Sequence, residues 1–154
     1  MKTAIVYYSK HHGNTKKLVD AIASKFEVTL IDAAENTTID LDDFDCIGFA
    51  SGIYFSSFAK QVLSLAEKNL PENKEVFFIS TCGVKSPVVY LNAIRKIAKA
   101  KNCHELGTYL CLGFDTFGPF NVIGGIAKGH PDEKEIADAV KFYQKTIILN
   151  RNHL

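Results

Sequence analysis

The stretch AIVYYSKHHGNTKKL, at residues 4–18, decides the fold because it joins two kinds of regular structure through one polar loop. Residues 4–8 are an apolar run rich in β-branched and aromatic side chains, which is typical of a buried strand. From Leu18 onward, apolar residues recur at helical spacing, through Val19, Ile22 and Phe26. A strand that leads directly into a helix favours an α/β architecture.

The same alternation continues to the end of the chain. Four more β-rich apolar runs lie at residues 28–31, 46–50, 76–80 and 106–112. Three later groups of apolar residues have the spacing of a helix face. They are Phe58, Val62, Leu65 and Ala66, then Ile94, Ile97 and Ala98, and last Ile136, Val140, Tyr143 and Ile147. Pro131 is expected at the first position of the last helix. The pattern predicts one α/β domain over residues 1–154, with a doubly wound five-stranded parallel sheet covered by helices on both faces.

Composition argues against several classes of protein. The 154 residues are 47% hydrophobic and 23% charged with a net charge of +1, so nothing favours binding to nucleic acid or to a membrane surface. No secretory signal peptide is visible, and the longest uncharged run, residues 46–59, is shorter than the ~20 residues of a membrane helix. Cys46, Cys82, Cys103 and Cys111 form no C-x-x-C pair, so we expect reduced thiols in a cytoplasmic protein.

The polar loop after the first strand has the chemistry of an anion site. In open α/β sheets, ligands bind beyond the carboxyl ends of the strands. A helix beginning near Gly13 or Asn14 would direct unpaired backbone N–H groups at a ligand there, and Ser9 and Thr15 add neutral donors. We interpret the loop as a phosphate site. The alternative is a polar turn in which Asn14 or Thr15 caps the helix. The two histidines have no carboxylate or cysteine nearby, so no metal site is expected.

This strand–SKHHGNT–helix stretch resembles the phosphate-binding loop of flavodoxin-like FMN proteins, in which a hydroxyl residue and a short spacer precede T-G-x-T. Four positions match the pattern: Ser9, Gly13, Asn14 and Thr15. His12 stands where the family usually has threonine, and the spacer is one residue longer. The resemblance covers essentially the whole chain. It implies a strand order of 2-1-3-4-5 and a noncovalent FMN whose phosphate lies in residues 9–15, with Lys10 and His11 in the same loop.

Two further loops are similar to those that hold the flavin ring in this family. Candidate ring-binding residues are Ser51, Gly52, Ile53, Tyr54 and Phe55 after the third strand, and Thr81, Cys82 and Gly83 after the fourth. The resemblance implies a backbone carbonyl for the flavin N5 in the first loop, with Tyr54 and Phe55 as candidate stacking partners. The family's usual tyrosine is missing from the second loop, because Tyr90 lies inside a predicted helix. Cys82 is interpreted as a small loop residue rather than a redox thiol.

Residues 113–130 form an unusually long connection before the last helix, with five glycines and three phenylalanines. We expect a cap near the flavin, with Phe114 and Asp115 at the cofactor, or a docking surface. The alternative is that the phenylalanines only anchor a long loop to the core. His130 is interpreted as a helix-start residue rather than a catalyst.

Three functions remain open. The first is an FMN electron carrier that serves an unidentified partner oxidoreductase, as a monomer or homodimer. The second is an FMN-dependent NAD(P)H:quinone-type oxidoreductase, and the third is a flavin-free binding module. The carrier is preferred because the sequence has no G-x-G-x-x-G dinucleotide fingerprint and no convergent acid–base set, so no catalytic residue is assigned.

Charge around the expected cofactor is mostly positive. Lys10, Lys16, Lys17 and Lys85 lie in or beside its loops, and Asp115 is the only acid among them. We therefore expect the reduced, anionic flavin to be favoured relative to an acidic carrier. The acids at residues 40–45 precede the third strand and are expected at the opposite end of the sheet.

Overall fold

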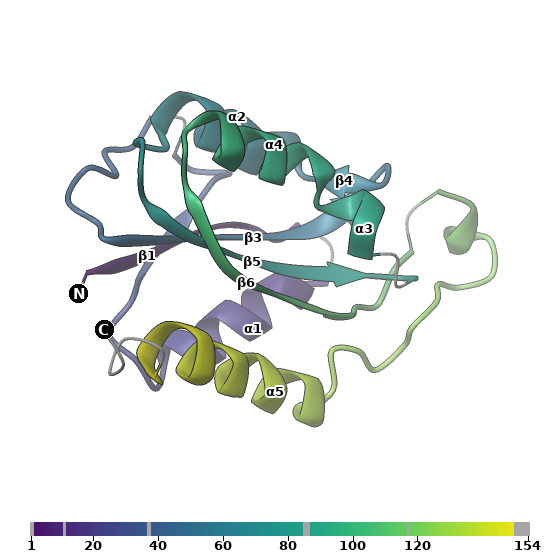
Figure 1. The fold of residues 1–154 in the computed structure, drawn as a ribbon. Helices are drawn as coiled ribbons and strands as arrows, with labels where there is room; N and C mark the ends of the chain where they lie inside the picture. The colour runs from purple at the N-terminus through teal and green to yellow at the C-terminus, as the bar shows by residue number, and fades with distance from the viewer. Residues whose placement is uncertain (1, 11, 37, 85–86, 117, 150–154) are drawn as a thin grey trace.

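A central twisted sheet carries helices on both faces (Figure 1). The computed structural model describes residues 2–10, 12–36, 38–84, 87–116 and 118–149. The strands are β1 (Thr3–Tyr8), β2 (Thr29–Asp32), β3 (Cys46–Tyr54), β4 (Ser57–Phe58), β5 (Glu75–Cys82) and β6 (His104–Leu112). Parallel neighbours follow the order β2-β1-β3-β5-β6, and β4 pairs only with β3. With that short strand set aside, the expected order 2-1-3-4-5 is confirmed.

The helices divide between the two faces of the sheet. They are α1 (Asn14–Ala23), α2 (Lys60–Asn69), α3 (Pro87–Tyr90), α4 (Asn92–Ala100) and α5 (Glu133–Tyr143), with a 3₁₀ turn η1 (Gly118–Asn121) and a final π-type turn η2 (Gln144–Ile148). Figure 1 shows α2 and α4 on one face and α1 and α5 on the other. The segment at 113–130 projects beyond the carboxyl ends of the strands, where a ligand is expected.

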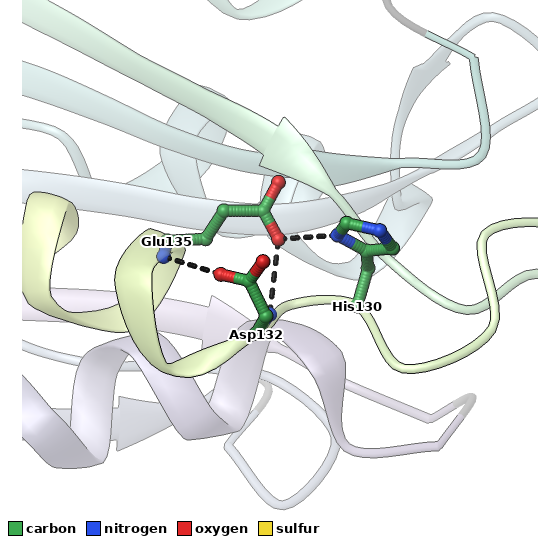
Figure 2. Close-up of side chains that lie close together, drawn as sticks. All are labelled: His130, Asp132 and Glu135. Carbon is green, nitrogen blue, oxygen red and sulfur yellow. Dashed lines mark hydrogen bonds and ion pairs between the residues drawn. The ribbon is translucent and has the colours of Figure 1, made fainter.

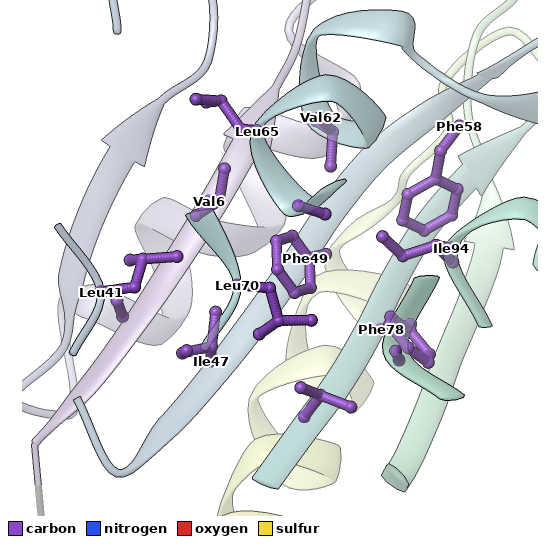
Figure 3. Packing of buried hydrophobic residues seen from close by; sticks show 14 of the residues in the cluster. Val6, Leu41, Ile47, Phe49, Phe58, Val62, Leu65, Leu70, Phe78 and Ile94 are labelled. Atoms are coloured by element: carbon purple, nitrogen blue, oxygen red, sulfur yellow. The ribbon is translucent and has the colours of Figure 1, made fainter. Parts of the chain in front are cut away.

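Alternation along the strands builds two cores. In β1, Ala4 and Val6 face α2 and α4, while Ile5 and Tyr7 join the cluster under α1 and α5. Figure 3 shows the first cluster, in which Phe49 and Phe78 of neighbouring strands pack beneath α2 and α4. Because both faces of the sheet are buried, the strands are continuous runs of apolar residues, and such runs can be recognised in the sequence.

β3 and β5 extend beyond their expected carboxyl ends, and α2 begins later than expected. β3 and β5 continue past residues 50 and 80, because Ser51 and Gly52 still pair in register with Ser80 and Thr81. Phe58 was expected on a helix, but it lies in β4 opposite Ile53, and α2 begins only at Lys60. β3 and β4 therefore form a hairpin at the end of the sheet. The acids at 40–45 precede β3 and lie at the opposite end of the sheet, as expected.

The long segment at 113–130 has a structure of its own, within its described residues. Asp115 and Ile126 exchange backbone hydrogen bonds of 3.0 and 2.8 Å as an isolated antiparallel bridge. The N–H of Phe114 donates to the carbonyl of His130 over 2.9 Å, so the segment closes as a loop with paired ends. Phe117 lies outside the described residues.

The start of α5 differs from the expectation for Pro131. The helix begins at Glu133 with Asp132 as its N-cap, so Pro131 precedes the cap. Asp132 and Glu135 form a capping box, in which each side chain accepts a backbone N–H of the other. Figure 2 shows His130 joining them, with Nδ1 2.6 Å from Glu135 Oε2. His130 is thus a helix-start residue, as predicted. The ligand-type atoms of these three residues lie within 4.8 Å of one another, a grouping that these hydrogen bonds explain.

All four cysteines are thiols. None of the helices in the described part of the chain has both the length and the apolar character needed to cross a membrane.

The Glu135 carboxylate should stabilise the fold in a pH-dependent way. Burial alone would raise its pKa, but hydrogen bonds from His130 and from the backbone N–H groups of Asp132 and Leu112 hold the pKa below the ordinary value of 4.5. The contribution is therefore complete above about pH 4.5 and is lost as the pH falls through the depressed pKa of the folded state. Glu135→Ala should cost about 1–2 kcal/mol in urea unfolding at pH 7, with the deficit narrowing at pH 3.5. Glu133→Ala, in the same exposed first turn, is the control, and an equal loss in both variants would contradict this role.

Candidate functional site

A narrow cleft opens at the carboxyl edge of the sheet, where the loops after three strands meet the start of α1. We call it the edge cleft. Its lining residues are Asn14, Thr15, Gly52, Ile53, Tyr54, Thr81, Cys82, Gly83, Gly113, Phe114 and Asp115. All of these except Gly113 are candidates from the sequence. The structure therefore brings together residues up to 101 positions apart, as expected for a site at the point where strand order reverses.

The first turn of α1 is prepared for an anion. Gly13 is the N-cap and adopts a left-handed φ of 65°, which glycine tolerates without strain. A Cβ built on Gly13 meets nothing within 4 Å, so the backbone here is open to close approach. Ser9 Oγ accepts the N–H of Lys16 over 3.0 Å. The alternative in which Asn14 or Thr15 caps the helix is not observed, because both residues lie within α1.

Behind this turn lies a buried polar pair. The hydroxyls of Thr15 and Thr81 are 2.9 Å apart, and both residues are almost fully buried. This bond links the start of α1 to the end of β5. Because a hydroxyl donates one hydrogen bond and accepts others, Thr15 keeps its donor for a ligand when Thr81 donates to it.

Asn14 holds an acceptor that no described group satisfies. Its Nδ2 donates to the carbonyl of Phe114 over 2.8 Å, but its buried Oδ1 has no hydrogen-bond partner. A buried acceptor left unpaired costs about 1–3 kcal/mol, and Asn14 lines the edge cleft. A donor from a bound molecule would remove that cost.

His12 contacts the long segment rather than pointing into the edge cleft. Its Nε2 lies 3.0 Å from Thr116 Oγ1, and its ring packs on Phe114 with centroids 4.2 Å apart. The first loop and the 113–116 segment are thus joined beside the cleft. His11 lies outside the described residues.

The β3–β4 hairpin forms the opposite wall. The buried hydroxyl of Ser51 donates to the carbonyl of Gly52 and accepts the N–H of Ala59, so Ser51 shapes the hairpin. Tyr54 lines the cleft and packs edge-to-face on Tyr8 at 6.0 Å. Phe55 lies at the turn, is 85% exposed and does not line the edge cleft.

Beyond β5, the chain is fixed by small residues and close packing. Cys82 is buried, and its thiol donates to the carbonyl of Cys111 over 3.5 Å, which suits a small structural residue. At Gly83, an added Cβ would lie 2.8 Å from Asp115 Oδ2 and 2.8 Å from Ile126 Cδ1, so these two side chains would have to move to admit a larger residue. The Tyr90 hydroxyl donates to the carbonyl of Val84, and burial raises the Tyr90 pKa. Tyr90 therefore braces this loop from α3.

Gly113 lines the edge cleft but was not predicted from the sequence as a site residue. An added Cβ there would lie 2.8 Å from Asn14 Nδ2, so glycine is needed where β6 ends against α1. Its position directly after an apolar run was the available signal. The edge cleft is narrow and partly open to solvent, and its interior volume of about 30 Å³ has room for one or two water molecules.

The positive charge expected around the site is partly compensated. Lys16 Nζ lies 2.6 Å from Asp20 Oδ2, one helical turn away, and this hydrogen bond raises the pKa of Lys16. Lys10 and Lys17 are exposed, and Lys85 lies outside the described residues. The expected push toward a reduced, anionic flavin is therefore weaker than a count of lysines implies.

Solved structures of several flavoproteins share this fold. A WrbA-like flavodoxin from Agrobacterium tumefaciens superposes with a TM-score of 0.68 at 14% identity, over 100% of both chains. A flavodoxin from the domain Archaea gives 0.56 at 15%, over 94% of this chain and 98% of the other. A flavoprotein of Lactobacillus acidophilus, solved in complex with FMN, gives 0.56 at 19%, over 71% and 92%.

Sequence comparison assigns the family. An uncharacterized protein of Methanocaldococcus jannaschii, MJ0298, is 35% identical over 153 residues, which cover 97% of this chain and 100% of that protein. The sequence profile of the flavodoxin domain matches residues 5–104, which include the first loop, the hairpin and the loop after β5. The chain therefore belongs to the flavodoxin domain family.

Proposed function

We propose that the protein binds FMN noncovalently in the edge cleft and carries electrons to or from a partner oxidoreductase. The observation that carries this proposal is the convergence of the α1 start, the β3–β4 hairpin and the loops after β5 and β6 around buried polar atoms that include the unsatisfied Asn14 Oδ1. Family membership supports it, as does the FMN complex of the similar Lactobacillus acidophilus flavoprotein.

The residues present suit the parts of FMN. The open backbone at Gly13 and the first N–H groups of α1 would hold the phosphate, with the Thr15 hydroxyl as a further donor. Asn14 Oδ1 would accept a hydrogen bond from a ribityl hydroxyl. The isoalloxazine ring would lie between the hairpin residues 52–54 and the loop at 81–83. FMN would supply the electron-accepting and electron-donating chemistry.

The protein's own side chains would bind FMN and shield it from water. The Thr15–Thr81 bond fixes the distance between the helix start and the ring-binding loop. The contact of His12 with Phe114 holds the 113–116 segment over the cleft, which would exclude water from one side. The interior volume of the edge cleft is about 30 Å³ and the cleft is partly open to solvent, so a flavin ring would lie at its mouth or displace its walls.

If the FMN phosphate binds at Thr15, a variant without the Thr15 hydroxyl should lose more affinity for FMN than for riboflavin. FMN should bind far better than riboflavin, which lacks the anion. Thr15→Ala removes a hydrogen bond to a charged group, which is worth roughly 1.5–3 kcal/mol, or ten- to a hundredfold in the Kd for FMN. The Kd for riboflavin should change no more than it does in Thr81→Ala, because both variants break the same hydroxyl pair. Thr15→Ser keeps the hydroxyl and should retain most of the affinity in a flavin fluorescence titration.

Thr81→Ala is the matched control for this variant. It breaks the same 2.9 Å hydroxyl pair but leaves the Thr15 hydroxyl in place. Any loss should be equal for FMN and riboflavin, because Thr81 is assigned to the ring. If Thr15→Ala also weakens both flavins equally, the phosphate lies elsewhere.

The carrier role can be tested by asking which donor reduces the protein and which acceptor the reduced protein then reduces. Protein reconstituted with FMN should show a visible flavin band that persists under anaerobic NADPH. A catalytic amount of an NADPH-dependent flavoprotein reductase should bleach the band, and the reduced protein should then reduce cytochrome c. Direct turnover with NADPH and a quinone would instead support the oxidoreductase alternative, and protein that takes up no FMN would support a binding module.

A further inference from the structure

The strand β6 forms one edge of the sheet (Figure 1). It runs for nine residues, from His104 to Leu112, and pairs with β5 on one side, while no further described strand pairs with its other side. The opposite edge is different, because β2 has only four residues and ends at Asp32. Short strands and charged side chains usually protect a sheet edge from pairing with another chain. β6 is therefore the edge on which a further strand could pair.

The middle of β6 carries no charge. Residues 106–112, with the sequence LGTYLCL, are uncharged, and only Cys111 among them is fully buried. The charge next to this run is compensated within the chain, because the Arg95 guanidinium donates to both carboxylate oxygens of Glu105 over 2.9 and 2.7 Å. A strand that pairs here would thus meet a neutral edge with partly exposed leucines.

Two hydrogen bonds at the end of β6 show which way its backbone groups point. The N–H of Gly113 donates to the carbonyl of Cys82 in β5 over 2.9 Å. The N–H of Leu112 donates instead to Oε1 of Glu135, in α5, over 3.3 Å. Successive N–H groups of a strand point to opposite sides. The even-numbered residues near this end of β6 therefore direct their N–H groups away from β5.

Thr108 and Leu110 carry the outward backbone groups in the middle of the strand. The register with β5 is unbroken from Gly107 to Leu112, so the alternation holds over this stretch. The extra residue of the ladder, Leu106, comes before it, and the N–H of Leu112 is already bonded. An added strand would therefore pair with Thr108 and Leu110.

We propose that β6 pairs in antiparallel orientation with β6 of a second copy of this chain, about a twofold axis at Tyr109. Thr108 of each copy would exchange two backbone hydrogen bonds with Leu110 of the other copy. Two such pairs give four bonds. The parallel sheets of the two copies would then join into one sheet, and the partly exposed leucines of β6 would lie in the contact.

The sequence of β6 suits pairing with itself. About an axis at Tyr109, Gly107 faces Cys111 of the other copy, and Thr108 faces Leu110. The two Tyr109 residues face each other in the closely spaced, non-hydrogen-bonded position, where aromatic pairs are favourable. Like charges directly opposite each other would destabilise such a contact, and this stretch has none. A second copy therefore meets the requirements of this edge.

Hydrogen exchange tests the pairing without any substitution. Sedimentation from micromolar to millimolar protein should show a monomer converting to a dimer. Over the same range, exchange of the Thr108 and Leu110 amides should slow at least about tenfold, because each becomes hydrogen-bonded. The amides of Tyr109 and Cys111 point toward β5 in either state, so they are the internal control and should slow far less.

Variants at one position separate the backbone from the side chain. Leu110→Pro removes an outward N–H from each copy and leaves the ladder with β5 intact, so two of the four proposed bonds are lost. The dissociation constant of the dimer should rise about ten- to a hundredfold. Leu110→Ala, the matched control, keeps the N–H and should change the constant by less than about fivefold. Val122→Ser, at an 89% exposed position outside the sheet, should leave it unchanged.

Protein that stays monomeric at millimolar concentration overturns the proposal. A dimer in which Thr108 and Leu110 exchange at the rate of the monomer also overturns it, because the contact then lies on another face. Loss of the dimer in Val122→Ser would likewise contradict pairing through β6. Unfolding in urea checks that each variant is folded, and if Leu110→Pro is not, exchange in the unaltered protein decides. The dimer should form with or without FMN, so failure of the proposed function leaves this result intact.

Discussion

Burial of the parallel sheet on both faces is the constraint on which the rest of this structure depends. Strand side chains alternate between two cores, as Val6 and Ile5 do in neighbouring positions, so each face needs its own pair of helices. Each helix must cross over the sheet before the next parallel strand begins, and the crossovers bring every strand to its end at the same edge. The edge cleft is a direct consequence, since the loops after β3, β5 and β6 have no other place to meet.

At that edge the buried strands must change to polar loops, and the polar groups are paired locally. Ser51 is bonded within its own hairpin, and Thr81 is bonded to Thr15 across the cleft. These bonds offset the cost of burying hydroxyls next to an apolar core. Asn14 is only half satisfied, because its Oδ1, like Asn69 Oδ1 and Ser80 Oγ, is buried without a partner among the described residues, and of these three residues Asn14 is the one that lines the edge cleft. Residues whose polar groups are paired, such as Ser51 and Thr81, build the cleft, whereas Asn14 has an acceptor available to a ligand.

Much of the fold and of the edge cleft could be predicted from the sequence. All five strands of the parallel sheet were predicted, because residues buried on both faces form continuous apolar runs. Ten of the eleven residues of the edge cleft were candidates from the sequence, although seven of them lie inside α1, β3 and β5 rather than in loops. The hairpin was missed because Phe58 fits the helical spacing of Val62 and Leu65, and only pairing with Ile53 reveals its strand. The Asp115–Ile126 bridge and the contact between His12 and Phe114 join distant positions, which local patterns cannot specify. Lys16 was counted among the positive charges around the cofactor, although Asp20 four residues later is a helical neighbour of opposite charge.

The contact of His12 with Phe114 and Thr116 has a kinetic consequence. The interior of the edge cleft is too small for a flavin ring, so a ring that binds deeply can enter only those molecules in which the walls have parted. Observed affinity is then the intrinsic affinity multiplied by the fraction of open molecules. The association rate is limited in the same way, and it falls below the diffusional value because opening must come before entry. A ring that passes this segment would enter and leave by the same opening, so the strength of the contact of His12 with Phe114 would affect the rates of uptake and release alike.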